Sequence, residues 1–299
     1  MITANQHRRL EAVRNCVVDY VALTKPRLTL LALFTTLAGF CVGSADAFNL
    51  TLLVHVLVGT GLLGGGAAAL NHYLERHADA RMPRTASRPL PAGRMRPIEA
   101  MVFGALLCLI GIIYLNLATN HLTAALGVLT VVVYLAIYVP LKQRTPWCTL
   151  VGAVPGALPP VLGYAAATNT IDAGAIILFA ILFLWQIPHF FAIAMVYRDD
   201  YRAANMPMLP VVDVKGRRTS RQIMLTSLAL LVATLWPTYS GIAGLQYLSA
   251  ALFLGFIFGA FAFDAAVVRT PAAARRLFLA SVLYLPLILA VMVWDRTPA

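Results

Sequence analysis

Charged residues are scarce in this chain. Only 12% of its 299 residues are Asp, Glu, Lys or Arg, where soluble domains have roughly a quarter, and 60% are hydrophobic. Among the charged residues the acidic ones are the scarcer, with 12 Asp and Glu against 23 Lys and Arg, so the net charge is +11. This composition excludes an ordinary water-soluble domain and indicates a protein whose solvent is lipid.

Cysteine is also rare, and its spacing excludes a zinc site built on close pairs of cysteines. The four cysteines are Cys16, Cys41, Cys108 and Cys148. No two of them have the close spacing of a zinc site, and three fall in or beside apolar segments. We therefore interpret them as small buried hydrophobic residues rather than as ligands.

Apolar segments long enough to cross about 30 Å of hydrocarbon recur along the whole chain. They are continuously apolar, unlike the alternating strands of a membrane barrel, so they predict helices. We expect an all-α integral membrane protein with about nine transmembrane helices, near 28–45, 51–70, 98–118, 121–140, 148–167, 173–196, 223–243, 247–268 and 277–294.

The basic residues predict how these helices are oriented. Twenty-two of the 23 Lys and Arg fall into five clusters, and with nine spans all five lie on one side of the membrane. The positive-inside rule makes that side cytoplasmic, which also places the N-terminus inside. Topology therefore accounts for the positive charge, and a nucleic-acid partner is not needed to explain it. The clusters lie at 8–27, 76–96, 142–144, 198–221 and 269–276.

We expect one polytopic domain over 1–299, in which 1–25 form a cytoplasmic N-terminal arm. The first apolar segment follows this charged arm and has no convincing cleavage site, so it does not resemble a signal peptide. Two cytoplasmic connections are long, at about 71–97 and 197–222. Since long polar loops in a minimal protein usually carry function, we expect the active site there.

The first long connection opens with an oxygen-rich stripe. Asn71, Glu75 and Asp79 are four residues apart, so on a helix they share one face at the cytoplasmic end of the second span. Carboxylate and amide oxygens suit Mg²⁺, which usually also binds substrate phosphates. Arg84 and Arg88 follow closely enough to hold the same phosphate. The alternative is an ordinary solvated helix end, but acidic groups are costly next to an apolar span.

The second long connection repeats this arrangement. Asp199 and Asp200 stand where the sixth span meets the cytoplasm, between Arg198 and Arg202. Both connections also contain a Met-Pro pair downstream of the acids. Two acidic clusters on one membrane face are suited to a diphosphate bridged by metal between them.

These stretches resemble the UbiA superfamily of intramembrane prenyltransferases over nearly the whole chain. Within that superfamily, the runs Met82–Pro89, Trp185–Phe190 and Pro207–Pro210 are similar to the haem-farnesylating branch, the haem O synthases. Three positions depart from the superfamily pattern, where Glu75 and Tyr197 replace Asp and Asn205 replaces Gly. Asn tolerates the left-handed conformation, so we expect the turn at Asn205 to be kept. The resemblance covers 24–27, 71–91, 141–145, 156–160, 185–190 and 199–212.

The resemblance implies transfer of the farnesyl group of farnesyl diphosphate to a vinyl group of haem B, giving haem O and diphosphate, in a bacterial inner membrane. It implies that Mg²⁺ is the cofactor, held by Asn71, Glu75, Asp79, Asp199 and Asp200, which carry the catalysis. It also implies contacts to substrate from Lys25, Arg27, Arg84, Arg88, Lys142, Arg144 and Tyr197.

A haem acceptor needs a site of its own, and His189 is the candidate. It lies within the sixth apolar span, where an ionisable residue is usually functional, and it follows Pro188. Its imidazole would ligate or orient the haem iron. The alternative is a buried histidine bonded to a neighbouring helix. Whether the product passes directly to a haem A synthase or to terminal oxidase assembly proteins stays open.

Two other functions compete with this one. The first is a UbiA-type prenyltransferase with an aromatic or quinone-precursor acceptor, which shares the chemistry and differs in the acceptor pocket. The second is a transporter of an anionic lipid or of phosphate. A transporter should place its polar residues near the bilayer midplane, whereas nearly all acids here lie at the cytoplasmic interface, which favours an enzyme.

Overall fold

The computed structural model describes residues 4–44 and 48–297, with side chains from residue 13 onward in the first helix. Residues 1–3, the side chains of Arg8 and Arg9 in the first basic cluster, and 45–47 of the predicted connection near 46–50 lie outside the described residues. Helices account for all regular elements within that range, apart from one isolated bridge between Ala243 and Arg296.

Nine helices in the described part of the chain are long and apolar enough to span a membrane. This confirms the predicted all-α membrane fold, and each predicted segment overlaps one of them. They are α2 (Pro26–Gly43), α3 (Leu50–Asp79), α4 (Pro97–Ala118), the continuous run of α5 (His121–Val132), η1 (Val133–Tyr138) and α6 (Val139–Leu141), α7 (Cys148–Thr168), α8 (Ala173–Val196), α11 (Arg217–Tyr239), α12 (Leu245–Val268) and α13 (Pro271–Trp294).

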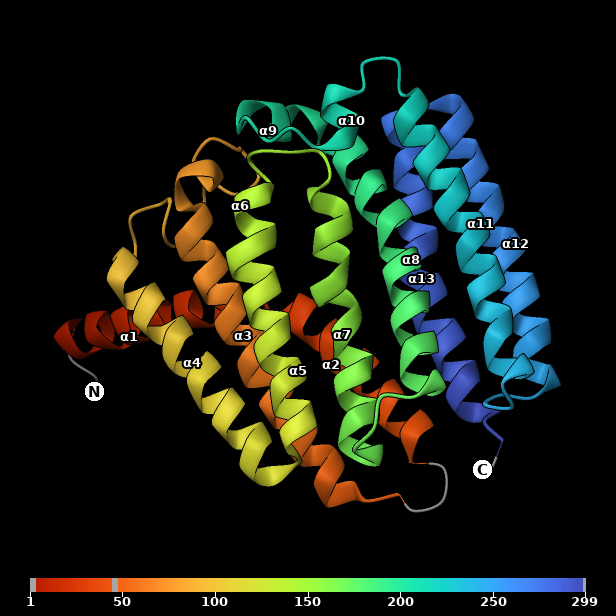
Figure 1. Ribbon diagram of the computed structural model, residues 1–299. Helices are drawn as coiled ribbons and strands as arrows, with labels where there is room; N and C mark the ends of the chain where they lie inside the picture. The colour runs from red at the N-terminus through yellow and green to blue at the C-terminus, as the bar shows by residue number, and fades with distance from the viewer. Residues whose placement is uncertain (1–3, 45–47, 298–299) are drawn as a thin grey trace.

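The N-terminal arm is itself a helix, α1 (Ala4–Leu23), which lies across the bundle rather than along it (Figure 1). Arg94 holds its second half by donating to both carboxylate oxygens of Asp19 at 3.0–3.2 Å. Tyr20 packs edge-on against Phe103 of α4, with ring centroids 4.9 Å apart. The chain then turns at Lys25, whose φ is +46°, and enters α2. α1 therefore fixes where Lys25 lies.

The predicted boundary of the second span was wrong, because α3 runs nine residues past residue 70. Its 30 residues give a length of roughly 45 Å, well beyond the hydrocarbon thickness. The connection to α4 is therefore 80–96 rather than 71–97, and the stripe lies on the last turns of α3, as its helical spacing predicts. Thr85 ties this connection back by donating to the carbonyl of Asp79 at 2.8 Å.

Small residues let α3 and α4 approach closely, as is common in membrane bundles. A Cβ added to Gly66 would lie 2.7 Å from the backbone nitrogen of Cys108. α2 and α7 meet in the same way, since a Cβ on Gly39 would overlap the backbone of Pro160. These contacts place α2, α3 and α7 around one another, while large apolar side chains such as Leu106 and Ile110 of α4 are exposed toward the lipid.

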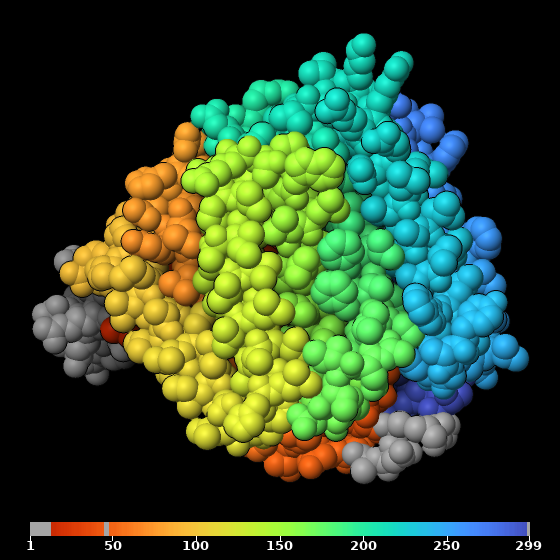
Figure 2. All heavy atoms as spheres, viewed as in Figure 1, coloured from red at the N-terminus to blue at the C-terminus, as the bar shows by residue number. Residues whose placement is uncertain are grey.

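The polar connections gather at one end of the bundle. The connections 80–96, 142–147 and 197–216 all lie at the top in Figure 1, and the last contains the short helices α9 (Arg198–Ala203) and α10 (Leu209–Val212). Figure 2 shows that segments around residues 80, 145 and 205 form a continuous surface there. Segments distant in sequence therefore meet at the end of α3 that carries the stripe.

Candidate active site

Three polar side chains form a buried stripe on the last turns of α3. Asn71, Glu75 and Asp79 are four residues apart, and they are 2%, 3% and 1% exposed. The spacing places them on one face of the helix, as the sequence predicts. Their burial goes beyond that prediction, because neighbouring segments cover this face of the helix end.

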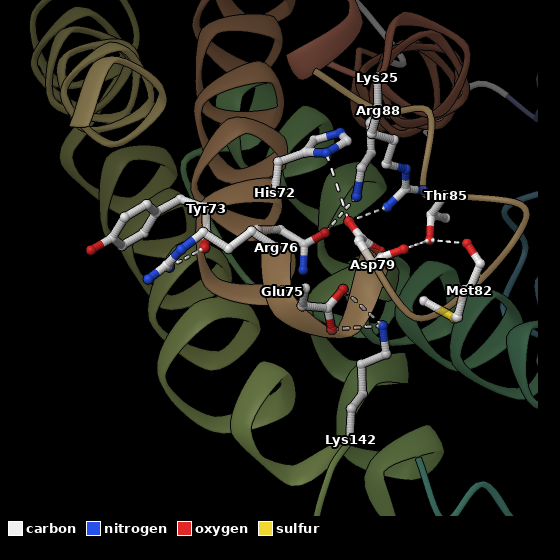
Figure 3. Close-up of polar contacts among 11 residues, drawn as sticks. Lys25, His72, Tyr73, Glu75, Arg76, Asp79, Met82, Thr85, Arg88 and Lys142 are labelled. Carbon is white, nitrogen blue, oxygen red and sulfur yellow. Dashed lines mark hydrogen bonds and ion pairs between the residues drawn. The ribbon is translucent and has the colours of Figure 1, made fainter. Parts of the chain in front are cut away.

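Each member of the stripe meets a cation from a different segment of the chain. Figure 3 shows the contacts of Glu75 and Asp79. Lys25, at the junction of α1 and α2, donates to the side-chain oxygen of Asn71. Lys142, just after α6, lies with its Nζ 2.8 Å from Oε1 of Glu75. Arg88, in the connection after α3, donates from Nη1 to Oδ2 of Asp79 at 2.7 Å. The fold thus brings cations from three segments of the chain onto one helix face.

The pKa values of the two lysines are shifted in opposite directions. Burial, with the nearby positive charge of Arg88, lowers the pKa of Lys25 to about 8. Burial also opposes the charged form of Lys142, but the adjacent carboxylate of Glu75 outweighs it and raises the pKa of Lys142 well above its usual value. Lys25 is therefore the less well compensated cation, and an anionic ligand would favour its charged form.

Several buried polar atoms beside the stripe have no hydrogen-bond partner in the described part of the chain. They are Nδ2 of Asn71 and both ring nitrogens of His72. His72 is 3% exposed, and its Nδ1 lies 4.0 Å from Oδ2 of Asp79. Buried polar groups are normally satisfied, so unpartnered atoms of this kind indicate a site that a ligand completes.

The chemistry of the stripe fits Mg²⁺. Among the described residues, no three His, Cys, Asp or Glu side chains are arranged to hold a metal ion, because the oxygens face cations instead. A complete protein cage is not required, however, since Mg²⁺ usually binds one or two carboxylates together with substrate phosphates. Glu75 and Asp79 supply such carboxylates beside the cations that a diphosphate would need.

Arg84 links the second acidic segment to the first connection. Its Nε lies 3.8 Å from Oδ2 of Asp200 in α9, and its guanidinium lies over the ring of Tyr197 at 4.9 Å. Asp199 points elsewhere. Its side chain is 90% exposed and pairs with Arg202 at 2.7 Å. Of the two predicted acids, Asp200 is therefore the one oriented toward the first connection.

An apolar cluster that sequence reasoning missed holds the two connections together. Met82 and Met206, from the two Met-Pro pairs, are 3% and 1% exposed and lie in one cluster with Met208 and Cys148. Asn205, just before the second pair, has φ of +56°, which confirms the predicted left-handed turn. The repeated Met-Pro pattern was the available signal, and it marks packing between the loops.

Two predicted substrate-binding residues are not brought into this network. Arg27 and Arg144 are exposed, and neither has an ion-pair or side-chain hydrogen-bond partner among the described residues. Both lie near lysines that are part of it, Lys25 and Lys142. The alternation of basic residues along the sequence does not distinguish the cation that faces inward from its neighbour that faces out.

His189 lies apart from the stripe, between α8 and α13. Its Nδ1 is 2.6 Å from Oγ of Ser281, and that hydroxyl also contacts the carbonyl of Phe278 at 2.6 Å. A carbonyl only accepts, so the hydroxyl donates to it and accepts from the Nδ1–H of His189. This assigns the proton to Nδ1, and the lone pair of Nε2 has no partner among the described residues. Trp185 stacks on the half-buried imidazole with ring centroids 4.7 Å apart, and Phe278 lies 5.2 Å away.

Comparison with known proteins gives consistent matches along the chain. A sequence model described as the UbiA prenyltransferase family matches residues 32–288. The chain is 46% identical over 287 residues to a protoheme IX farnesyltransferase of Solibacter usitatus, covering 93% of this chain and 98% of that protein. It is 47% identical over 296 residues to a protoheme IX farnesyltransferase of Koribacter versatilis, covering 95% of each.

Solved structures share the fold at low sequence identity. A structure of digeranylgeranylglyceryl phosphate synthase has a TM-score of 0.77 at 15% identity, covering 93% of this chain and 98% of that one. A UbiA homologue from Archaeoglobus fulgidus bound to GPP and Mg²⁺ has a TM-score of 0.62 at 14% identity, covering 92% and 99%. These likenesses concern the fold alone.

Proposed function

Since the chain belongs to the UbiA prenyltransferase family, we propose that it transfers the farnesyl group of farnesyl diphosphate to a vinyl group of haem B. The products are haem O and diphosphate. The observation that carries this proposal is the buried stripe Asn71, Glu75 and Asp79, with Lys25, Lys142 and Arg88 directed onto it. The high identity to relatives that bear the name protoheme IX farnesyltransferase supports the choice of haem as acceptor.

The proposed diphosphate site combines metal and protein cations. Asn71, Glu75 and Asp79 would hold Mg²⁺ from one side, and Asp200 would approach from the second connection. The metal, when bound, neutralises negative charge on the leaving diphosphate. Asp199 was predicted as a further ligand, and its exposed side chain would have to turn inward to serve as one.

The basic residues of the site have a complementary role. Lys25, Lys142 and Arg88 each contact an oxygen of the stripe, so they lie within reach of an anion bound beside it. Arg84 adds a guanidinium on the side of the second connection. These cations stabilise the diphosphate as it takes the electron pair of the breaking C1–O bond.

The rest of the reaction takes place among apolar side chains. The allylic C1 of the farnesyl group forms a bond to the terminal vinyl carbon of haem B. The positive charge left beside the porphyrin ring is quenched by water, whose oxygen adds to the inner vinyl carbon and whose proton is released. The reaction consumes farnesyl diphosphate, haem B and water and produces haem O, diphosphate and the released proton, so the atoms balance. The helical bundle keeps bulk water from the allylic cation before this step.

We place the porphyrin against His189. Its Nδ1 is engaged by Ser281, so its Nε2 lone pair is available to the haem iron, and Trp185 and Phe278 provide aromatic surface beside it. An orienting bond on the second ring nitrogen is the usual arrangement for a histidine ligand. The bond to Ser281 of α13 is also the contact of a structural histidine, and iron ligation is our proposal for Nε2.

The protein is an integral multi-pass membrane protein, and we propose that the stripe faces the cytoplasm of a bacterial inner membrane. The connections at the end of the bundle where the stripe lies contain most of the basic residues, and the positive-inside rule makes that end cytoplasmic. Single cysteines at Ala86 and Val214, in a chain lacking the four native cysteines, should resist an impermeant thiol reagent in intact cells. A cysteine at Thr170, at the opposite end, should react. The reverse pattern would contradict this orientation.

A UbiA-type enzyme with an aromatic or quinone-precursor acceptor is the main rival. The purified protein should be incubated with farnesyl diphosphate and Mg²⁺, and either haem B or 4-hydroxybenzoate, followed by product analysis. We expect a farnesylated haem and no farnesylated benzoate. Farnesylation of the benzoate alone would overturn the proposed acceptor and leave the diphosphate site intact.

A further inference from the structure

A second group of cations lies at the polar end of the bundle, in a cavity separate from the stripe. The cavity measures about 160 Å³, and its walls carry Arg198, Lys215 and Arg269. None of the three forms an ion pair within the described part of the chain. The acid in the lining, Asp213, accepts from the backbone N–H and hydroxyl of Thr219 at 2.8 and 3.1 Å. The cavity therefore has an excess of positive charge.

Both arginines of the cavity have N–H groups that are available to an anion. Nε of Arg198 is buried and has no hydrogen-bond partner among the described residues. Arg269 is fixed in place, because its Nε donates to Oγ of Ser220 and its Nη1 donates to the carbonyl of Lys215, both at 3.0 Å. Its Nη2 is left without a protein acceptor over the same range. Arg269 is exposed, but the buried Nε of Arg198 is costly without a partner, so an anion in the cavity would be stabilising.

The cavity lies along the same pair of helices as His189. Pro271 of α13 lines it, and Phe278 of α13 packs against the imidazole. These two residues are seven apart, which places them on one face of α13 and about 10 Å apart along its axis. Met195 of α8, six residues after His189, also lines the cavity. The cations therefore lie about two helical turns from the imidazole, toward the polar end.

We infer that this cavity binds the propionate carboxylates of the tetrapyrrole acceptor. The inference rests on the proposed function, which supplies a dicarboxylate porphyrin next to His189. A volume of about 160 Å³ excludes the whole macrocycle but accommodates its carboxylate ends. The two turns between imidazole and cations are comparable with the reach from the centre of a porphyrin to its propionates. Guanidinium groups suit carboxylates because they offer two parallel donors.

This placement also orients the acceptor. The vinyl groups lie on the opposite side of haem B from its propionates. Carboxylates held by Arg198 and Arg269 would therefore direct the vinyl edge away from the cavity and into the bundle. The diphosphate site, with cations of its own, needs none of these residues. The cavity would thus select which edge of the porphyrin reaches the allylic carbon.

The test compares haem B with its dimethyl ester, which keeps the macrocycle and loses both negative charges. Binding to the purified protein is followed by haem absorption in a neutral detergent, without farnesyl diphosphate or Mg²⁺. We expect the wild type to bind haem B roughly tenfold or more tightly than the ester, as for a charge-assisted contact. Replacing Arg198→Gln and Arg269→Gln together, the two arginines that hold the carboxylates, should remove that preference and leave the affinity for the ester unchanged. Arg275→Gln, an exposed arginine of α13 outside the cavity, is the matched control and should keep the preference.

Equal binding of haem B and its ester by the wild type would overturn the inference, and this arm does not depend on whether a variant folds. The inference would also fail if added phosphatidylglycerol abolished the preference for haem B over its ester, since the cavity would then be a lipid headgroup site. Turnover tests the proposed function and the role of the cavity separately. A wild type that farnesylates both acceptors equally well refutes the cavity alone. A wild type that farnesylates neither acceptor refutes the proposed function and the inference with it.

Discussion

Arg88 donates from Nη1 to Oδ2 of Asp79 at 2.7 Å, and the carboxylate it meets is 1% exposed. The arginine comes from the connection after α3, and the aspartate ends the helix. Without a ligand, this bond satisfies a buried charge that has few other partners. With a diphosphate bound beside Asp79, the same guanidinium is placed to hold phosphate oxygens. The relationship therefore connects the stability of the site with its chemistry.

Arg88→Lys should lose activity although the charge is kept, because an ammonium cannot reproduce a two-pronged contact to phosphate. Loss of one charge-assisted bond of about 1.5–3 kcal/mol would slow the reaction roughly ten- to more than a hundredfold. The loss should appear in kcat/KM for farnesyl diphosphate, while haem binding is intact. Wild-type kinetics for farnesyl diphosphate in this variant would show that Arg88 contributes only to the orientation of the protein in the membrane.

Glu75 and Lys142 allow structural and catalytic roles to be separated. Lys142→Met leaves the buried carboxylate of Glu75 without its cation, and breaking a buried pair from one side costs about 3–5 kcal/mol. The midpoint of thermal unfolding in detergent should fall. The double variant Glu75→Gln with Lys142→Met should regain most of that stability and stay inactive. Recovery of activity together with stability would show that the pair is only structural.

Asp200 and Asp199 should differ in importance, although they are adjacent. Asp200 faces Arg84 across the two connections, whereas Asp199 is exposed and pairs with Arg202. We expect Asp200→Asn to lower kcat/KM for farnesyl diphosphate at least about tenfold more than Asp199→Asn, a difference of ~1.4 kcal/mol. Equal losses would mean that Asp199 turns inward when substrate binds.

The sequence predicted the membrane fold, the stripe and most of its cations, because these depend on local pattern. Apolar length predicts spans, and a four-residue spacing places Asn71, Glu75 and Asp79 on one face. Which cation faces which acid depends on tertiary packing. Lys25 meets Asn71 across 46 positions, and nothing in the local sequence distinguishes it from the exposed Arg27.

Local sequence patterns could not predict where α3 ends or what surrounds His189, because both depend on tertiary packing. Apolarity stops near residue 70, but the helix continues to Asp79 because other segments cover its polar turns. Ser281 stands 92 positions from His189 in an apolar helix, where a lone serine is unremarkable in sequence. Only the packing of α8 against α13 brings the two together.

Ser281→Ala should impair haem binding without touching the diphosphate site. The change removes the acceptor that holds the proton of His189 on Nδ1, so the orientation of Nε2 is no longer fixed. We expect a changed absorption spectrum of bound haem and a raised KM for haem B, with KM for farnesyl diphosphate unaltered. Ser249→Ala, an exposed serine of α12, serves as the control. An unchanged spectrum would argue that His189 does not ligate the iron.

The central claim is that the Asn71–Asp79 stripe drives Mg²⁺-dependent farnesyl transfer to haem. Its most direct test is the mass of haem recovered after purified protein is incubated with haem B, farnesyl diphosphate and Mg²⁺. For the wild type, we expect haem B plus one farnesyl group and one hydroxyl group. We expect unmodified haem B when Mg²⁺ is chelated or when Asp79→Asn is used. Unmodified haem from the wild type, or a farnesylated product from Asp79→Asn at the wild-type rate, would contradict it.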